Sequence, residues 1–120
     1  MGAFFLLRIN DHMQYLRKIS ATLDGGGTFH GTDPHDCQLG HWLDDAGPQE
    51  SAEYGPSAVA VFDALREPHE EFHLSSKRAL AFKDAGDEAG AAAQSTQMHQ
   101  LSNTLVAGLL ELDGLASGKR

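Results

Sequence analysis

The sequence predicts an all-α fold, an antiparallel four-helix bundle with an additional short helix that carries the only cysteine. Apolar residues recur at spacings of three and four over several long segments, which is typical of helices that each bury one face in a shared core. Short stretches rich in glycine, proline and acidic residues separate these segments, and no segment shows the alternation of a strand. Helical segments with short connections pack as antiparallel bundles.

The first helix is expected over residues 3–24. Its apolar positions follow an alternating four-three spacing once His12 is included, so His12 is expected to face the core. The apolar members of this stripe are Phe5, Ile9, Leu16, Ile19 and Leu23. Taken alone, His12 fits a core histidine satisfied by ordinary hydrogen bonds. The run Asp24-Gly25-Gly26-Gly27 ends the helix, because glycine readily adopts the left-handed conformation of helix C-termini.

A short second helix is expected from Pro34 to Asp45, and it contains Cys37. Thr32 or Asp33 would cap this helix, with the proline in its first turn, where proline is favoured. The Gly-Pro pair that follows is expected to stop it. Residues 46–56 are rich in glycine, proline and acidic residues and are therefore predicted to form a loop.

A long third helix is expected to open at Gly55-Pro56-Ser57. The residues on its predicted inner face are Val59, Phe62, Leu65, His69, Phe72, His73, Ser76 and Leu80. Pro68 interrupts this pattern, because a proline inside a helix removes one backbone hydrogen bond and costs about 3 kcal/mol. Two outcomes are open: the helix kinks at Pro68, or it breaks and restarts with Pro68 in its first turn.

The last helix is expected over residues 88–113, with Asp87 as its N-cap and Gly114 near its end. Its apolar positions are Met98, Leu101, Leu105, Leu109 and Leu112. These spacings again place one apolar face toward a core, which completes the bundle.

Length and charge narrow the classes of function. At 120 residues the chain is expected to form a single stand-alone domain, residues 1–120. The formal net charge of −8 argues against partners such as nucleic acid or an anionic membrane, because both require basic patches. No stretch is apolar enough to span a bilayer, and the start of the sequence does not read as a signal peptide. We therefore expect a cytoplasmic protein, and its one cysteine excludes an intrachain disulfide.

Four residues indicate metal binding. His69 and His73 lie four positions apart, so on a helix they project from the same face, which Phe72 marks as apolar. Imidazoles in an apolar seam favour a bound divalent metal. His12 and Cys37 are the other metal-competent residues expected at buried positions. Three imidazoles and one thiolate make a four-coordinate set that suits Zn²⁺.

The same stretch also reads as H-E-x-x-H, the motif of zinc metallopeptidases, with Glu70 as general base. The extended form of this motif is absent, since Ser76 and Ala79 stand where it has glycine and histidine. Four protein ligands also leave no position for the water that such an enzyme activates. A di-iron bundle is disfavoured by the thiolate and by the shortage of interior carboxylates. A purely structural zinc site remains an alternative.

The pattern resembles the chemoreceptor zinc-binding (CZB) domain family of bacterial signalling proteins. The family signature is a histidine followed three residues later by an aromatic residue or leucine, then Cys-x-Leu-Gly-x-Trp, then His-x-x-x-His. The matching residues here are His12, Tyr15, Cys37, Leu39, Gly40, Trp42, His69 and His73. The resemblance extends over about residues 8–113. It implies a four-helix bundle and zinc ligation by His12, Cys37, His69 and His73.

The resemblance also implies a function. Such a chain would be a non-enzymatic zinc-binding sensory or regulatory domain in chemotaxis or cyclic-di-GMP signalling, and such domains commonly form homodimers. Family members are usually attached to a chemoreceptor signalling domain or a diguanylate cyclase. This sequence contains neither, so a partner of that kind is expected in trans.

Two further expectations follow from particular residues. Metal coordination would hold Cys37 as the oxidisable thiolate, which suggests redox sensing. The apolar run Phe4-Phe5-Leu6-Leu7 is wider than one helix face can bury, which predicts a homodimer. Gly40 is expected to allow close helix approach, and Trp42 to pack around the site. His30, His41 and His99 are expected not to be ligands. His35, two residues before Cys37, is expected to face solvent, and a role beside the metal or as an alternative ligand stays open for it.

Overall fold

The computed structural model describes residues 3–117, and in this range it contains six helices and no strand. The helices are α1 (Ala3–Leu23), α2 (Gln38–Asp44), α3 (Gly47–Ala52), α4 (Pro56–Asp63), α5 (Arg66–Asp84) and α6 (Glu88–Ala116). The predicted all-α fold is confirmed. Within the described residues, no helix has both the length and the apolar character needed to cross a membrane.

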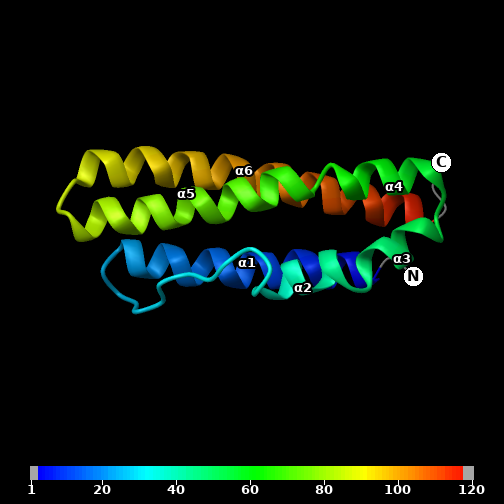
Figure 1. The fold of residues 1–120 in the computed structure, drawn as a ribbon, viewed down its shortest axis with the longest axis horizontal. Helices are drawn as coiled ribbons and strands as arrows, with labels where there is room; N and C mark the ends of the chain where they lie inside the picture. Colours follow the sequence, from blue (N-terminus) through cyan, green and yellow to red (C-terminus); the bar gives the residue numbers. More distant parts are fainter. Residues whose placement is uncertain (1–2, 118–120) are drawn as a thin grey trace.

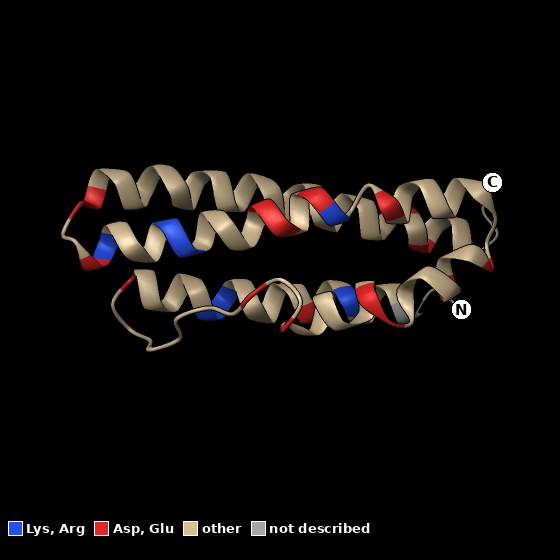
Figure 2. Cartoon of the chain, viewed as in Figure 1, with Lys and Arg blue, Asp and Glu red and all other residues tan. Residues whose placement is uncertain are grey.

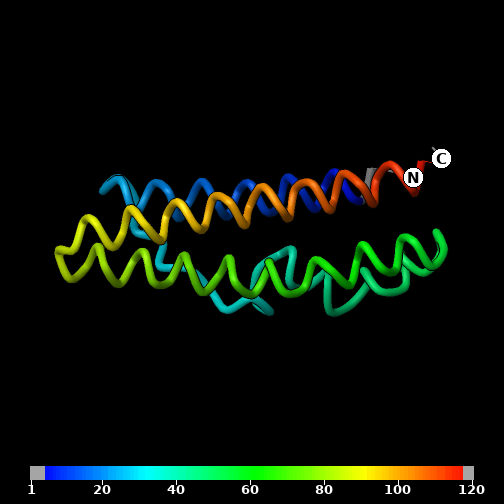
Figure 3. The backbone as a smooth tube through the Cα atoms, turned by 90° about the horizontal axis from the view of Figure 1, so that it is seen from above, coloured from blue at the N-terminus to red at the C-terminus, as the bar shows by residue number. Residues whose placement is uncertain are grey.

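The helices form an elongated bundle measuring 48 × 20 × 18 Å (Figure 1). α1 runs in one direction, α2 and α3 return, α4 and α5 run forward again, and α6 returns. Seen from above, α1 lies beside α6, while α2 and α3 lie beside α4 and α5 (Figure 3). The second position of the four-helix bundle is therefore filled by a loop and two short helices rather than by one long helix.

The core runs along the bundle axis and is built from the predicted apolar stripes. Its fully buried members include Phe5, Ile19, Leu39, Phe62, Phe72, Met98, Leu105, Leu109 and Leu112. At one end, the Trp42 ring packs edge-on against the rings of Phe5 and Phe62, with centroid distances of 5.7 and 5.4 Å. Trp42 is therefore part of an aromatic cluster in the core, and its expected packing around the metal ligands stays a prediction. The Trp42 indole N–H donates to Glu50 at 3.0 Å.

The short helix begins later than the sequence predicted. Residues 34–36 form a turn, and Cys37 is the N-cap of α2, since its Sγ accepts a hydrogen bond from the Gly40 N–H at 3.2 Å. The prediction that Thr32 or Asp33 caps a helix opening at Pro34 is therefore wrong. The cysteine sulfur takes the place that a serine or aspartate oxygen usually occupies at an N-cap.

Gly47 and Pro48, which were expected only to end the preceding helix, also begin a new one. α3 covers Gly47–Ala52, with Pro48 in its first turn, so the prediction of a loop over residues 46–56 is wrong for this part. A proline in the first turn has no hydrogen bond to lose, which is why the same dipeptide can stop one helix and begin the next.

The long third segment breaks, and this decides between the two outcomes left open for Pro68. α4 ends at Asp63 and α5 begins at Arg66, so Pro68 lies in the first turn of α5. There the missing proline N–H costs no hydrogen bond inside the helix. The next residue, His69, has a regular backbone hydrogen bond to the Leu65 carbonyl at 3.1 Å.

The last helix agrees with prediction at its start and extends further at its end. Asp87 is the N-cap of α6, and its carboxylate accepts the Gly90 N–H at 2.9 Å. α6 continues through Gly114 to Ala116. Gly114 lies in open space with an ordinary helical backbone, so it weakens the helix without ending it.

Candidate metal centre

The approach of α2 to the preceding turn places Cys37. Gly40 is buried, and a Cβ atom at this position would overlap the Pro34 carbonyl oxygen. The expected role of Gly40 in close approach is therefore confirmed. The Cys37 Sγ lies 3.5 Å from the same carbonyl and accepts the Gly40 N–H, so one tight turn fixes the sulfur.

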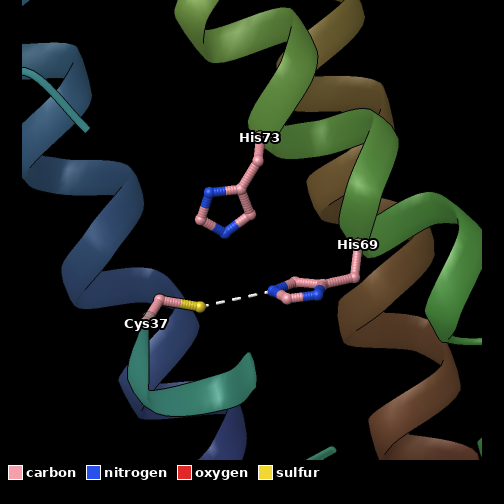
Figure 4. Close-up of side chains that lie close together, drawn as sticks. All are labelled: Cys37, His69 and His73. Atoms are coloured by element: carbon pink, nitrogen blue, oxygen red, sulfur yellow. Dashed lines mark hydrogen bonds between the residues drawn. The ribbon is translucent and has the colours of Figure 1, made fainter. Parts of the chain in front are cut away.

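Three of the four predicted ligands come together. The Cys37 Sγ and one ring nitrogen each of His69 and His73 lie within 4.8 Å of one another. The closest pair is Cys37 Sγ and His69 Nε2 at 3.3 Å (Figure 4). Cys37 reaches this space from the start of α2, and the two histidines reach it from successive turns of α5. Both histidines are buried, and Cys37 is partly buried.

A backbone carbonyl fixes the His73 ring. His73 Nδ1 lies 3.0 Å from the Thr32 carbonyl oxygen, which can only accept, so Nδ1 carries the proton and donates. Nε2 is then left with a free lone pair, the form that binds a metal. The Tyr15 hydroxyl accepts the Thr32 N–H at 2.7 Å, so Thr32 ties the loop to both α1 and α5. A backbone carbonyl leaves no signal in a sequence, so this contact was not predictable.

Burial keeps the imidazoles neutral at physiological pH. Desolvation, with a smaller contribution from the neighbouring His73, lowers the pKa of His69 to about 3 and that of His12 to about 4. Desolvation also lowers the pKa of His73 and raises the pKa of the Cys37 thiol. Neutral imidazole binds metal without first losing a proton, whereas the thiol must lose one.

The donor set and its spacing fit zinc. Zn–N bonds of about 2.0–2.1 Å and Zn–S bonds of about 2.3 Å place the nitrogen and sulfur of a tetrahedral site about 3.5 Å apart. The distance of 3.3 Å between Cys37 Sγ and His69 Nε2 agrees with this value. Cysteine and histidine are also the ligands that select zinc over magnesium or calcium. These residues would hold the ion between α2 and α5.

His12 lies outside this cluster of ligand atoms. It is buried on α1, with its ring packed edge-on against Phe72 at a centroid distance of 4.6 Å. Its Nε2 lies 2.9 Å from the Ser102 hydroxyl on α6. The predicted core position of His12 is confirmed, whereas its assignment as the fourth ligand remains a prediction. Ser102 was not singled out from the sequence, although a serine within an apolar helical stripe was a usable signal.

The other histidines lie at the surface. His30, His35, His41 and His99 are all exposed. His35 Nδ1 pairs with the Asp44 carboxylate at 2.7 Å, and Arg66 approaches the other oxygen of Asp44 at 3.6 Å. The Asp44 carboxylate holds the pKa of His35 above its usual value. This network joins the turn before Cys37 to α2 and α5.

The fold and these donors define a class of protein, a helical bundle domain with an interior site for a thiophilic divalent metal. A family model described as the chemoreceptor zinc-binding domain matches residues 12–80, which is more than half of the chain. The chain therefore belongs to the CZB family, and the resemblance inferred from the motifs is confirmed. The matched range includes all four predicted ligands and ends within α5. No curated protein and no solved structure matches the chain.

Proposed function

We propose that this chain is a non-enzymatic sensory or regulatory domain of bacterial signal transduction that holds one zinc ion through His12, Cys37, His69 and His73. The observation that carries the proposal is the convergence of Cys37, His69 and His73 within 4.8 Å in a chain of the zinc-binding CZB family. Their pKa shifts favour the neutral imidazoles that such a site requires.

Cys37 is the residue through which the domain senses its signal. Bound zinc would keep the thiol deprotonated and therefore open to oxidation. The same sulfur caps α2, so oxidising it to the sulfenic acid changes both a metal ligand and the cap of a seven-residue helix. A loss of order around residues 37–44 would then be the output of the site.

Small oxidants have a route to this sulfur. A cavity of about 560 Å³ opens beside the site and is lined in part by His12, Tyr15, Thr32, Cys37 and His41. The partial exposure of Cys37 agrees with this route. A thiolate that is held by a metal and reachable from solvent is the arrangement expected of a redox sensor.

Zinc release under oxidation tests the redox part of the proposal. The zinc-loaded protein is treated with hypochlorous acid or hydrogen peroxide, and release is followed with a chromophoric chelator. We expect release from the wild type to be faster than from a Cys37→Ala variant, whose remaining ligands cannot form a sulfenic acid. Equal rates in the two proteins would leave a structural zinc site as the better description.

The peptidase alternative is not favoured by the arrangement of these residues. Cys37 Sγ lies 3.3 Å from His69, in the space where an activated water would be needed. Glu70, the candidate general base, is exposed on α5. Zinc-dependent peptide cleavage that is abolished by Glu70→Gln would overturn the non-enzymatic assignment.

The proposed partners are a second copy of the chain and a signalling protein of the chemoreceptor or diguanylate cyclase type in the cytoplasm. Leu6 and Leu7 on α1 and Leu110 on α6 are about half exposed, at 49%, 50% and 51%. Residues 89–110 of α6 contain no lysine, arginine, aspartate or glutamate, and Figure 2 shows this helix largely free of charge. A chain of net charge −8 associates with itself most readily through such a face.

A further inference from the structure

Ser102 occupies an unusual position on α6. The buried stripe of this helix runs through Met98, Ser102, Leu105, Leu109 and Leu112, so a serine stands where an apolar residue would fill the core. Ser102 is 3% exposed, and a buried hydroxyl without a partner is costly. Its Oγ lies 2.9 Å from His12 Nε2, and His12 is also 3% exposed. The two polar groups satisfy each other across the core, between the first and last helices.

This contact engages Nε2 of His12 and leaves Nδ1 as the nitrogen that Ser102 does not contact. If Oγ accepts the proton of Nε2–H, Nδ1 keeps its lone pair and can bind a metal. Histidines that bind metals almost always donate their second ring N–H to a nearby acceptor. His73 follows the same arrangement, with Nδ1–H donated to the Thr32 carbonyl and Nε2 left free. With Oγ as the acceptor, Ser102 would orient the His12 ring in the same way as the Thr32 carbonyl orients the His73 ring.

We propose that Ser102 is a positioning residue for the metal site, which accepts the Nε2–H of His12 and thereby presents Nδ1 as the metal-binding nitrogen. The inference rests on the proposed function in one respect, the assignment of His12 as a ligand. It adds α6 to the site, although the match to the family model ends at residue 80. Occupancy of the site is thereby coupled to the helix that lies against α1 and α5.

Zinc affinity tests this role. In Ser102→Ala we expect the affinity, measured by competition with a chromophoric chelator, to fall about 10- to 100-fold. Ser51→Ala is the matched control, because Ser51 is buried in α3 and its hydroxyl has no hydrogen-bond partner within residues 3–117. This control should retain wild-type affinity. Ser102→Thr keeps a hydroxyl at the same place and should recover part of the loss.

The ring tautomer of His12 supplies the second measurement. Long-range ¹H–¹⁵N NMR spectra of the zinc-loaded protein are expected to show His12 protonated at Nε2 and metal-bound at Nδ1. Metal binding through His12 Nε2, or unchanged affinity in Ser102→Ala, would overturn the role of Ser102 while leaving the zinc site intact. Unchanged affinity in His12→Ala would instead overturn the proposed ligand set, so the two failures are distinguishable.

Discussion

At the scale of single residues, Cys37 combines two roles that usually fall to different side chains. Its sulfur accepts the Gly40 N–H as the cap of α2 and lies 3.3 Å from His69 Nε2 as a candidate ligand. The sequence predicted the second role and missed the first. Because a serine oxygen can cap a helix but is a poor zinc ligand, substitution separates the two roles.

We predict that Cys37→Ser and Cys37→Ala both bind zinc weakly but differ in stability. In the presence of chelator, the free energy of unfolding of the serine variant should exceed that of the alanine variant by about 1 kcal/mol, because only serine restores the cap. Urea denaturation followed by circular dichroism measures this difference. Equal stability of the two variants would show that the cap contributes nothing.

The buried histidines also predict how stability depends on pH. In the unfolded chain a histidine has a pKa near 6.5, whereas burial lowers the folded pKa of His12 to about 4 and that of His69 to about 3. Between these values the unfolded state binds more protons, so stability falls as pH drops below about 6.5. The slope should approach about 1.4 kcal/mol per pH unit for each histidine.

Urea denaturation of the chelator-treated protein between pH 7.5 and pH 4.5 measures this slope. The variant His41→Ala removes an exposed histidine and should leave the slope unchanged, whereas His69→Ala should reduce it. A free energy of unfolding that stays constant from pH 7 to pH 5 would contradict the burial of neutral imidazoles.

At the scale of elements, regular helices were predictable from sequence and the connections between them were not. α1 and α6 follow their predicted ranges to within a few residues, because long amphipathic periodicity determines them. α3 was missed, and the break between α4 and α5 was left open as one of two outcomes, because proline can end a helix or begin one. Only packing against the rest of the bundle decides between these outcomes, and no local pattern encodes that packing.

In the candidate site, too, some features were predictable from the sequence and others were not. The spacing of His69 and His73 on one helix, together with the Cys37 motif, was sufficient to predict the three residues that converge. The contacts that orient the imidazoles were not predictable, because one is a backbone carbonyl and the other comes from a serine ninety residues away from His12. Long-range contacts of this kind depend on how the helices pack.

We predict that Gly40→Ala destabilises the protein, although alanine is normally the better helix former. A Cβ at Gly40 would overlap the Pro34 carbonyl, so the turn holding Cys37 must open, at a cost of about 1–3 kcal/mol. Gly114→Ala in α6 is the control, because this position has open space and should gain up to about 1 kcal/mol. Thermal unfolding with and without zinc compares them, and a Gly40→Ala protein as stable as the wild type would disprove the close approach.

At the scale of the whole molecule, the exposed leucines proposed for self-association lie near the start of α1 and the end of α6. The α5–α6 turn forms one end of the long axis, and the start of α1 and the end of α6 form the other (Figure 1). Leu6 and Leu7 lie in the first turns of α1, near the end of the bundle where α1 begins. Phe5, in the same turns, is buried in the core. The side chain of Phe4, also part of the predicted apolar run, lies outside the described residues.

We predict a homodimer that the double substitution Leu6→Glu and Leu7→Glu converts to a monomer, because it places charge on the proposed contact surface. Size-exclusion chromatography with light scattering at micromolar concentration measures the mass. Leu74→Glu on α5 is the control, since Leu74 is 41% exposed and lies outside the proposed contact. A wild-type protein that is monomeric under these conditions would exclude the dimer.

Metal analysis after dialysis against a chelator tests whether one zinc ion is held by His12, Cys37, His69 and His73. The wild type and the exposed-residue control His41→Ala should each retain one zinc per chain. Alanine variants of the four ligands should retain much less, with the largest losses for His69 and His73, which anchor the same helix. Zinc content in these four variants equal to that of the wild type would rule out this set of four ligands.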